Sequence, residues 1–214
     1  MNFDAAREQM VETQLQARGI TDPRVLLAMR MVPRHLFIEP ALQEHAYDDS
    51  PLPIDADQTI SQPYMVALMS EILALKGNER VLEIGTGCGY QTAVLAALAA
   101  EVFSIERIGT LTERTRARLD RLCERRRIRL RVGDGGEGWP TAAPFDAVIV
   151  TAAVQQVPRP LVDQLADGGR LVLPLGDAEL QGLACIRKQS TGLRHDYYGE
   201  CRFVKLIGQY GWEG

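Results

Sequence analysis

The feature that most constrains this chain is an apolar segment that runs directly into closely spaced glycines. Residues 81–91 read Val-Leu-Glu-Ile-Gly-Thr-Gly-Cys-Gly-Tyr-Gln. Glycine reaches positive φ at little cost and leaves no Cβ between the backbone and a ligand. A helix expected from Gln91 to about Ala100 would point its first amides into the turn. The segment therefore predicts a strand, a ligand-binding turn and a helix, although a tight connection without a ligand would look the same.

The spacing and the charge around these glycines narrow the choice of ligand. Gly85, Gly87 and Gly89 follow the pattern G-x-G-x-G, one residue shorter than the dinucleotide fingerprint. A carboxylate at Glu83 would repel phosphate and attract a cation. Both observations favour S-adenosylmethionine, which carries an α-ammonium and a sulfonium but no pyrophosphate. We expect these four residues and Thr86 to contact this cofactor.

Two later strand ends carry further acidic groups. Residues 101–106 form an apolar run that ends in Glu106, at about the distance where a nucleotide-binding half-sheet places a ribose-binding acid. Residues 128–132 lead into Asp134 and Gly135, and the Asp134 carboxylate is predicted to accept a hydrogen bond from an adenine amine. An acid at a strand end can also be a solvated boundary or a helix cap. Ligands of such sheets bind at the carboxyl ends of the strands, which favours the binding interpretation.

The remaining pattern predicts an α/β fold with a doubly wound, mostly parallel seven-stranded sheet. Buried strands are expected at 145–150 and 170–174, with a helix from Arg159 to about Ala166 between them. Two later strands are expected at 183–189 and 203–207. Alternating strands and helices produce a parallel sheet that is covered on both faces.

The chain is long enough for one domain, 1–214, in which 76–214 form the cofactor-binding sheet core. Residues 1–75 are expected to be a helical, substrate-side extension. It contains helices over 5–18, 23–31 and 63–75, the second with Asp22 as its N-cap.

Composition excludes several classes of protein. The formal net charge is −4, so the electrostatic field of the whole protein does not attract nucleic acid. Nine arginines fall in residues 114–131, but interleaved acids, Glu124 among them, indicate a solvated helix face. No apolar stretch is long enough to cross a bilayer, which predicts a soluble cytoplasmic protein.

Metal and thiol chemistry are not expected either. The histidines and cysteines lack metal-ligand spacing, so no metal site is predicted. Cys88 lies in the glycine turn, but small-residue packing against the cofactor is a better interpretation than nucleophilic catalysis. These residues are His35, His45, His195, Cys88, Cys123, Cys185 and Cys201.

At this point several motifs resemble one known family, the protein-L-isoaspartate O-methyltransferases. They include residues 81–90, the Gly-Asp-Gly at 133–135, residues 169–176, the Val-Pro-Arg at 32–34 and, most specifically, the Gln-Thr-Ile-Ser-Gln-Pro at 58–63. The resemblance extends from about Arg7 to Trp212. It implies a cytosolic, usually monomeric repair enzyme that methylates the α-carboxylate of isoaspartyl residues in damaged proteins and peptides.

The resemblance also implies roles for single residues. Ser61 matches the active-site serine of the family and would orient the acceptor carboxylate, while Thr59 and Ile60 would contact the cofactor beside it. An alternative for Ser61 is a plain cap of the helix that starts at Pro63. Arg34 is expected to form an ion pair at the surface.

Three departures from the family pattern leave two other functions open. The family usually has a serine at the position of Cys88 and a proline at the position of Lys205. It also commonly has a proline in the loop where this chain has Val154-Gln155. We expect cysteine in place of serine at position 88 to have no effect on function. Lys205 is expected either to attract acidic peptides or to point into solvent. The alternatives are a methyltransferase with another carboxylate, small-molecule or RNA acceptor, and a protein that binds the cofactor without transferring methyl.

Overall fold

The computed structural model describes residues 1–123 and 127–213. Within these ranges the helices are α1 (Phe3–Met10), α2 (Pro23–Met31), α3 (Pro63–Ile72), α4 (Tyr90–Leu98), α5 (Gly109–Leu122) and α6 (Arg159–Asp163). The strands are β1 (Leu52–Pro53), β2 (Thr59–Ile60), β3 (Arg80–Ile84), β4 (Glu101–Glu106), β5 (Ile128–Val132), β6 (Phe145–Val150), β7 (Leu165–Gly176), β8 (Gln181–Gln189) and β9 (Gly192–Cys201). Glu124, one of the acids predicted to interleave the arginines, lies outside the described residues.

The large sheet has the predicted doubly wound, mostly parallel architecture. Among the described residues it contains seven strands in the order β5-β4-β3-β6-β7-β8-β9. The five strands from β5 to β7 pair in parallel. Strand β8 pairs antiparallel with β7 on one side and with β9 on the other. Strand order reverses beside β3, so the carboxyl ends of β3, β4 and β6 meet where such sheets bind ligands.

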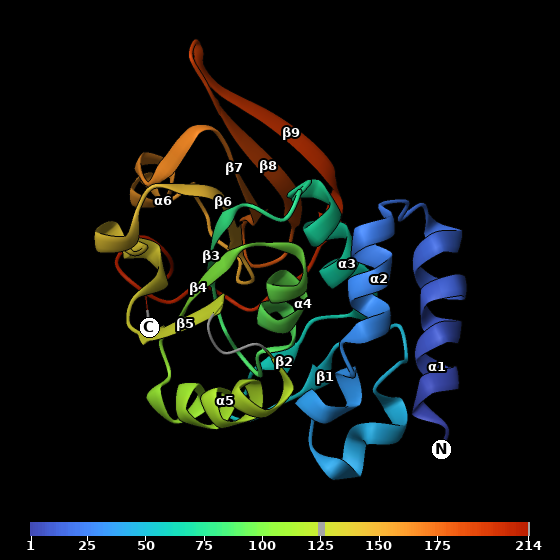
Figure 1. Ribbon diagram of the computed structural model, residues 1–214. Coiled ribbons are helices and arrows are strands. Elements are labelled where there is room, and N and C mark those ends of the chain that lie inside the picture. The colour runs from blue at the N-terminus through green and yellow to red at the C-terminus, as the bar shows by residue number, and fades with distance from the viewer. Residues whose placement is uncertain (124–126, 214) are drawn as a thin grey trace.

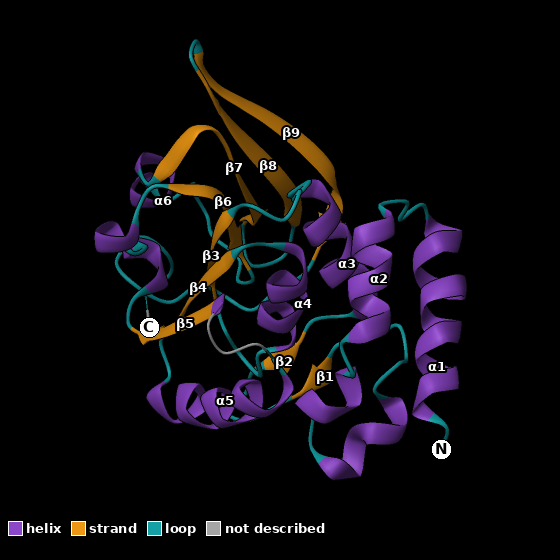
Figure 2. Ribbon diagram, in the orientation of Figure 1, coloured by secondary structure: helices purple, strands orange, loops and turns teal. Residues whose placement is uncertain are grey.

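Layers of helices cover both faces of the sheet. Val81 of β3 packs in one core with side chains of α2, α3 and α4, whereas its neighbour Leu82 packs in the other core with Leu161 of α6. Successive side chains of a strand point to opposite faces, which explains why a continuous apolar run is needed here. Figure 1 shows α1, α2 and α3 side by side at one flank, and Figure 2 shows the β8–β9 hairpin extending beyond the helices.

The seventh strand differs from the prediction. It is β9, paired with β8 from Gln181↔Cys201 to Gln189↔Gly192, and not residues 203–207. Nearly all of β9 is exposed, so no buried face imposes an alternating apolar pattern on it. Residues 203–207 are apolar for another reason, because Leu206 is buried in the core while Lys205 forms an isolated parallel bridge with Ala153.

Helix ends in the N-terminal extension follow the local signals. Asp22 caps α2 by accepting a hydrogen bond from the Arg24 amide at 2.8 Å, as predicted. The first helix continues beyond Met10 as a π-helical stretch and a short 3₁₀ turn, and it ends at Gly19 with φ of 93°. Helix α6 ends at Asp163, earlier than expected, because β7 already begins at Leu165.

Arg34 contradicts the prediction of a surface ion pair, because its side chain is fully buried. Nε donates to the Ala46 carbonyl at 2.7 Å, and the guanidinium lies 5.0 Å from the Tyr90 ring centroid. Burial lowers the pKa of this arginine because the charged form loses its hydration. Within the described structure, its two terminal nitrogens have no hydrogen-bond partner.

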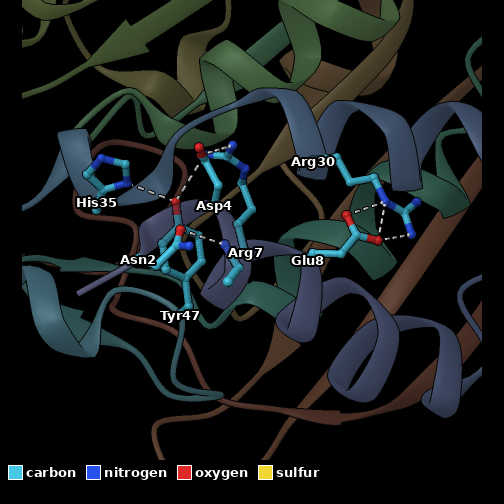
Figure 3. A network of polar contacts seen from close by, with 8 residues as sticks. Asn2, Asp4, Arg7, Glu8, Arg30, His35 and Tyr47 are labelled. Carbon is cyan, nitrogen blue, oxygen red and sulfur yellow. Dashed lines mark hydrogen bonds and ion pairs between the residues drawn. The ribbon is translucent and has the colours of Figure 1, made fainter.

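A polar network attaches α1 to the following segments. Figure 3 shows Arg30 of α2 facing Glu8 of α1, joined by an ion pair of 2.8 Å. In the same view His35 Nδ1 points to the Tyr47 hydroxyl, 2.9 Å away. The His35 ring also stacks on Phe3, with centroids 4.0 Å apart. Burial first, and then the positive charge of Arg7, lowers the pKa of His35.

The lowered pKa of His35 predicts that α1 is more weakly attached in acid. The unfolded state takes up the proton first as the pH falls below about 6.5, so the free energy of unfolding decreases below that pH. We expect His35→Phe, which keeps the ring stack, to show a smaller decrease than wild type between about pH 7.5 and 5.5 in urea denaturation. His195→Gln, on the exposed strand β9, is the control and should match wild type. An unchanged pH dependence in His35→Phe would contradict the prediction.

Candidate active site

A cavity of about 370 Å³ lies at the carboxyl ends of β3, β4 and β6. It collects segments from distant parts of the chain, including the β2 region, the glycine turn and residues 204–207. Eight of the residues predicted as a site line it: Thr59, Ile60, Ser61, Gly85, Thr86, Gly87, Glu106 and Gly135. The sequence therefore predicted part of the lining of this cavity.

The glycine turn after β3 leaves room for a ligand at one position and not at another. A Cβ at Gly87 would meet only the Ile54 Cδ1 atom, at 3.7 Å, so this part of the turn is open. A Cβ at Gly89 would lie 2.7 Å from Thr115 Cγ2. Gly89, predicted to contact the cofactor, is not among the described residues that line the cavity. It is the N-cap of α4, with φ of 89°, and allows this helix to pack closely against α5.

Glu106 lies where a ribose-binding acid is expected. Its side chain lines the cavity and is 7% exposed. Oε2 accepts a hydrogen bond from the Gly87 amide and Oε1 accepts one from the Ile108 amide, both at 3.0 Å. Each carboxylate oxygen has a second lone pair. The residue can therefore hold the backbone of the turn and still accept from two hydroxyl groups of a ligand.

Glu83 has a different position from the one predicted. Its side chain is fully buried, and the described residues that line the cavity do not include it. Oε2 accepts hydrogen bonds from Thr92 at 2.5 Å and from Ser104 at 2.6 Å. Burial raises the pKa of Glu83 to about 8, so the group is mostly neutral at pH 7. It therefore supports the turn from beneath rather than attracting a cation directly.

Asp134 also lies outside the set of described cavity-lining residues, although its neighbour Gly135 belongs to it. Its Oδ1 accepts from the Gly136 amide at 2.8 Å, and its Oδ2 accepts from the Gln209 amide at 2.7 Å. The carboxylate thus joins the turn after β5 to the C-terminal segment. As in Glu106, each oxygen keeps a second lone pair, so the contact with an adenine amine stays a prediction.

Ser61 lies in the wall between the cavity and a second chamber. This second chamber, of about 310 Å³, shares Thr59, Ser61, Thr151 and Val204 with the first. The alternative prediction of a helix cap is wrong, because Gln62 is the N-cap of α3 and no side chain of the described residues caps that helix. Within the described part of the chain the Ser61 hydroxyl has no hydrogen-bond partner, so it is available to a ligand.

The positions that depart from the family pattern fit the fold. Cys88 is 5% exposed and lines the cavity, and burial raises the pKa of its thiol, which disfavours a nucleophilic thiolate. Val154 is buried. The Nζ atom of Lys205 lies 4.6 Å from the Trp212 ring centroid. The residue lines the first cavity, at the carboxyl ends of β3, β4 and β6, and not the second chamber. This position does not favour the predicted contact with acidic peptides.

Some lining residues were not identified from the sequence. Thr151 follows β6 directly and lines both chambers. The available signal was its position, since a hydroxyl at the carboxyl end of a predicted parallel strand belongs at the ligand-binding edge. Among the described residues there is no group of three or more histidines, cysteines or acids arranged to hold a metal ion.

The fold and the cavity together define a class I methyltransferase, as comparison with solved structures shows. A protein-L-isoaspartate O-methyltransferase of 30% identity superposes with a TM-score of 0.84, covering 96% of this chain and 67% of that one. A second structure, described as a putative protein-L-isoaspartate O-methyltransferase from Plasmodium falciparum in complex with S-adenosyl-L-homocysteine, has a TM-score of 0.81 at 26% identity. That match covers 94% of this chain and 98% of the other.

Sequence comparison identifies the family within this class. The family model described as protein-L-isoaspartate(D-aspartate) O-methyltransferase matches residues 5–211. The chain is 56% identical to protein-L-isoaspartate O-methyltransferase 1 of Syntrophobacter fumaroxidans over the full length of both chains. It is 55% identical to protein-L-isoaspartate O-methyltransferase of Geobacter metallireducens over 99% of this chain and 98% of that one. The chain belongs to the protein-L-isoaspartate O-methyltransferase family.

The raised pKa of Glu83 predicts a loss of stability in mild alkali. The folded state retains a proton that the unfolded state releases near its ordinary pKa of about 4.3, so the free energy of unfolding decreases as the pH rises towards 8. We expect Glu83→Gln, which is neutral at every pH, to show less of this decrease between about pH 6 and 9 in urea denaturation. Glu101→Gln is the control, because its ion pairs with Arg80 and Arg129 lower the pKa of Glu101 away from this range. Parallel curves for Glu83→Gln and wild type would refute the assignment.

The position of Glu106 predicts a loss of cofactor affinity on substitution. We expect Glu106→Ala to weaken the binding of S-adenosylhomocysteine by roughly 1–3 kcal/mol, because hydrogen bonds to a charged acceptor are lost. Calorimetry measures this change directly. Glu106→Gln should also reduce the preference of the protein for adenosine over 2′,3′-dideoxyadenosine. If that preference is unchanged, Glu106 acts only on the backbone of the turn.

Proposed function

We propose that this protein transfers a methyl group from S-adenosylmethionine to the α-carboxylate of L-isoaspartyl residues in damaged proteins and peptides. One observation supports this function above the others. Ser61 lies in the wall shared by the cofactor cavity and the second chamber, and no described residue forms a hydrogen bond with its hydroxyl. A methyl donor in one chamber and a carboxylate in the other would meet at this residue.

The cofactor fits the residues around the first cavity. Gly87 leaves space for a ligand at the turn, and Glu106 offers acceptors for the ribose hydroxyls. Thr59, Ile60, Gly85, Thr86 and Gly135 complete the proposed binding set, and Asp134 keeps its proposed contact with the adenine amine. Glu83 and Gly89 act through the segments that they hold. When bound, S-adenosylmethionine supplies an electrophilic methyl group on a positively charged sulfur.

The acceptor group needs orientation more than activation. A carboxylate is already ionised near neutral pH, so no general base is required. In the displacement, a carboxylate oxygen forms a bond to the methyl carbon while the bond from that carbon to sulfur breaks and sulfur keeps the electron pair. Ser61 donates a hydrogen bond to the other carboxylate oxygen and aligns the first with the methyl group. We therefore assign Ser61 as the catalytic residue.

Exclusion of water supports the same reaction. Ile60, Val66 and Leu206 line the cavity and are buried, so apolar surface surrounds the reacting groups. A poorly hydrated carboxylate is a stronger nucleophile towards a cation. The product ester then closes spontaneously to a succinimide, which hydrolyses in part to normal aspartate. The repair outcome thus depends on the ester and not on further groups of the enzyme.

The second chamber is suited to the peptide that carries the isoaspartate. It lies between α3 and the end of β9 and has both aromatic and charged walls. Tyr64 and Tyr198 can contact apolar parts of a peptide, and Arg18, Glu200 and Arg202 can contact its charged side chains. Arg18 also forms an ion pair with Asp49 and lies 3.6 Å from the Tyr64 ring centroid. The chamber therefore provides both kinds of contact.

We further propose that residues 1–214 form one domain, in which 1–75 provide the substrate side and 76–214 the cofactor side. One continuous core contains Met10, Met29 and Met69 together with Val81 and Ala147 of the sheet, which supports this assignment. Among the described residues, no helix has the length and apolar character needed to span a bilayer.

Compartment and oligomeric state follow as proposals. All four cysteines are free thiols, as in proteins of a reducing compartment, which supports a cytoplasmic location. A monomer is proposed because the resemblance to the family implies one. Light scattering at working concentration measures the oligomeric state.

Substitution of Ser61 tests the proposed function. We expect Ser61→Ala to bind S-adenosylhomocysteine with nearly wild-type affinity and to transfer methyl to an isoaspartyl peptide about tenfold to a hundredfold more slowly. Radiolabelled methyl donor and release of the label from the base-labile ester measure the transfer. The control is Ser190→Ala, at an exposed position after β8, which should retain full activity.

Two results would count against this function. Full activity of Ser61→Ala would remove the role of the serine. Binding of the cofactor by the wild-type protein without transfer to any isoaspartyl peptide would favour another acceptor or a binding protein without transferase activity.

A further inference from the structure

Thr151 connects the end of β6 to the glycine turn. Its amide donates to the Ile84 carbonyl at 2.9 Å. Its hydroxyl Oγ1 lies 3.0 Å from the Ile84 carbonyl oxygen and 2.9 Å from the Gly85 carbonyl oxygen. A hydroxyl has one hydrogen, and both of these neighbours are acceptors. The Thr151 hydroxyl hydrogen is therefore committed to the backbone of the turn.

This commitment determines what Thr151 can offer to a ligand. With its hydrogen directed at the turn, Oγ1 offers only lone pairs to a ligand group that approaches it from the chambers that the residue lines. Such an oxygen accepts hydrogen bonds from a cation and cannot donate one to a carboxylate. Ser61 lies in the same shared wall, and its hydroxyl, which has no partner among the described residues, can donate. The two hydroxyl groups are therefore suited to ligand groups of opposite charge.

The order of the strands indicates which part of the cofactor reaches Thr151. Glu106 ends β4 and Thr151 follows β6, and these strands flank β3 on opposite sides. A ligand whose ribose lies on Glu106 can extend across the glycine turn towards β6. The end that extends this way carries the sulfonium and the amino-acid group, because the methyl donor must approach Ser61.

We propose that Thr151 binds the α-ammonium group of the cofactor and positions the Gly85 peptide for the same contact. The Oγ1 atom accepts a hydrogen bond from the ammonium group, while its own hydrogen fixes the Gly85 carbonyl. This inference rests on the proposed function, through the cofactor and the position of Ser61, but its test measures binding and not methyl transfer.

Gly85 and Thr151 are matched to one another in space. A Cβ at Gly85 would lie 2.4 Å from Thr151 Oγ1, and the φ of Gly85 is 94°. The close approach brings the Gly85 carbonyl within reach of the hydroxyl. Position 85 therefore needs glycine for two reasons: a Cβ would collide with Thr151 Oγ1, and the positive φ disfavours other residues.

The test compares two ligands that differ in the amino group alone. These are S-adenosylhomocysteine and its desamino analogue, which keeps the carboxylate. For Thr151→Val, which has the same shape without the hydroxyl, we expect the affinity for S-adenosylhomocysteine to fall about tenfold or more. The affinity for the desamino analogue should change less than about twofold. Thr151→Ser, which keeps the hydroxyl, should restore the preference for the amino compound. Isothermal calorimetry gives all the affinities without turnover.

A matched control and a second variant complete the experiment. Thr13 also donates its hydroxyl to a backbone carbonyl, that of Gln9 at 2.8 Å, so Thr13→Val should leave both affinities unchanged. If Thr151→Val does not fold, Thr151→Ala replaces it in the comparison. Equal losses for both ligands would overturn the proposal, because Thr151 would then only shape the turn. A Thr151→Ser protein that behaves like Thr151→Val would overturn it as well.

Discussion

The site depends on how the peptide groups of one short turn are held. The amides of Gly85 and Thr86 both donate to the Ile105 carbonyl of β4, at 2.8 and 3.3 Å. The Gly87 carbonyl accepts from the Thr115 hydroxyl of α5 at 2.6 Å, and the Gly85 carbonyl accepts from Thr151 after β6. Three neighbouring elements thus fix a segment that has no regular structure of its own. The glycines allow the backbone conformations that the turn needs. The rigidity of the turn comes instead from its hydrogen bonds to the surrounding elements. A cofactor therefore meets a turn that is already ordered, and its binding need not offset the entropy of ordering it.

Local patterns in the sequence were sufficient for the parallel part of the sheet. The runs that became β3, β4 and β6 are mostly apolar because both faces of the sheet are covered there. The same rule failed for β9, which is exposed and has no such pattern, and it wrongly selected residues 203–207. Those residues are apolar because they close the site beside Ala153. An apolar segment indicates that its residues are buried. It indicates a strand only where the segment is buried as part of the sheet.

The candidate site was predictable to the extent that its residues lie at strand ends. Glu106 and Ser61 line the cavity, whereas Glu83, equally acidic and close to the turn, is covered by Thr92 and Ser104. The sequence cannot separate these cases, because side chains alternate along β3 and only the packed structure shows which face receives a given residue. Arg34 illustrates the same limit. An arginine is rarely buried without a partner, so the general rule pointed to the surface while the core around Tyr90 enclosed it.

The unpaired hydroxyl of Ser61 has a consequence for product release. Methylation converts a charged acceptor into a neutral ester, and a hydrogen bond to a neutral acceptor is roughly half as strong as one to an ion. In its proposed role the serine would thus hold the substrate more firmly than the product. Because no protein group fixes its orientation among the described residues, the hydroxyl can rotate away as the ester leaves without breaking an internal contact. On the proposed function, a single uncommitted side chain would then favour turnover at both ends of the reaction, through capture of the damaged residue and dissociation of its ester.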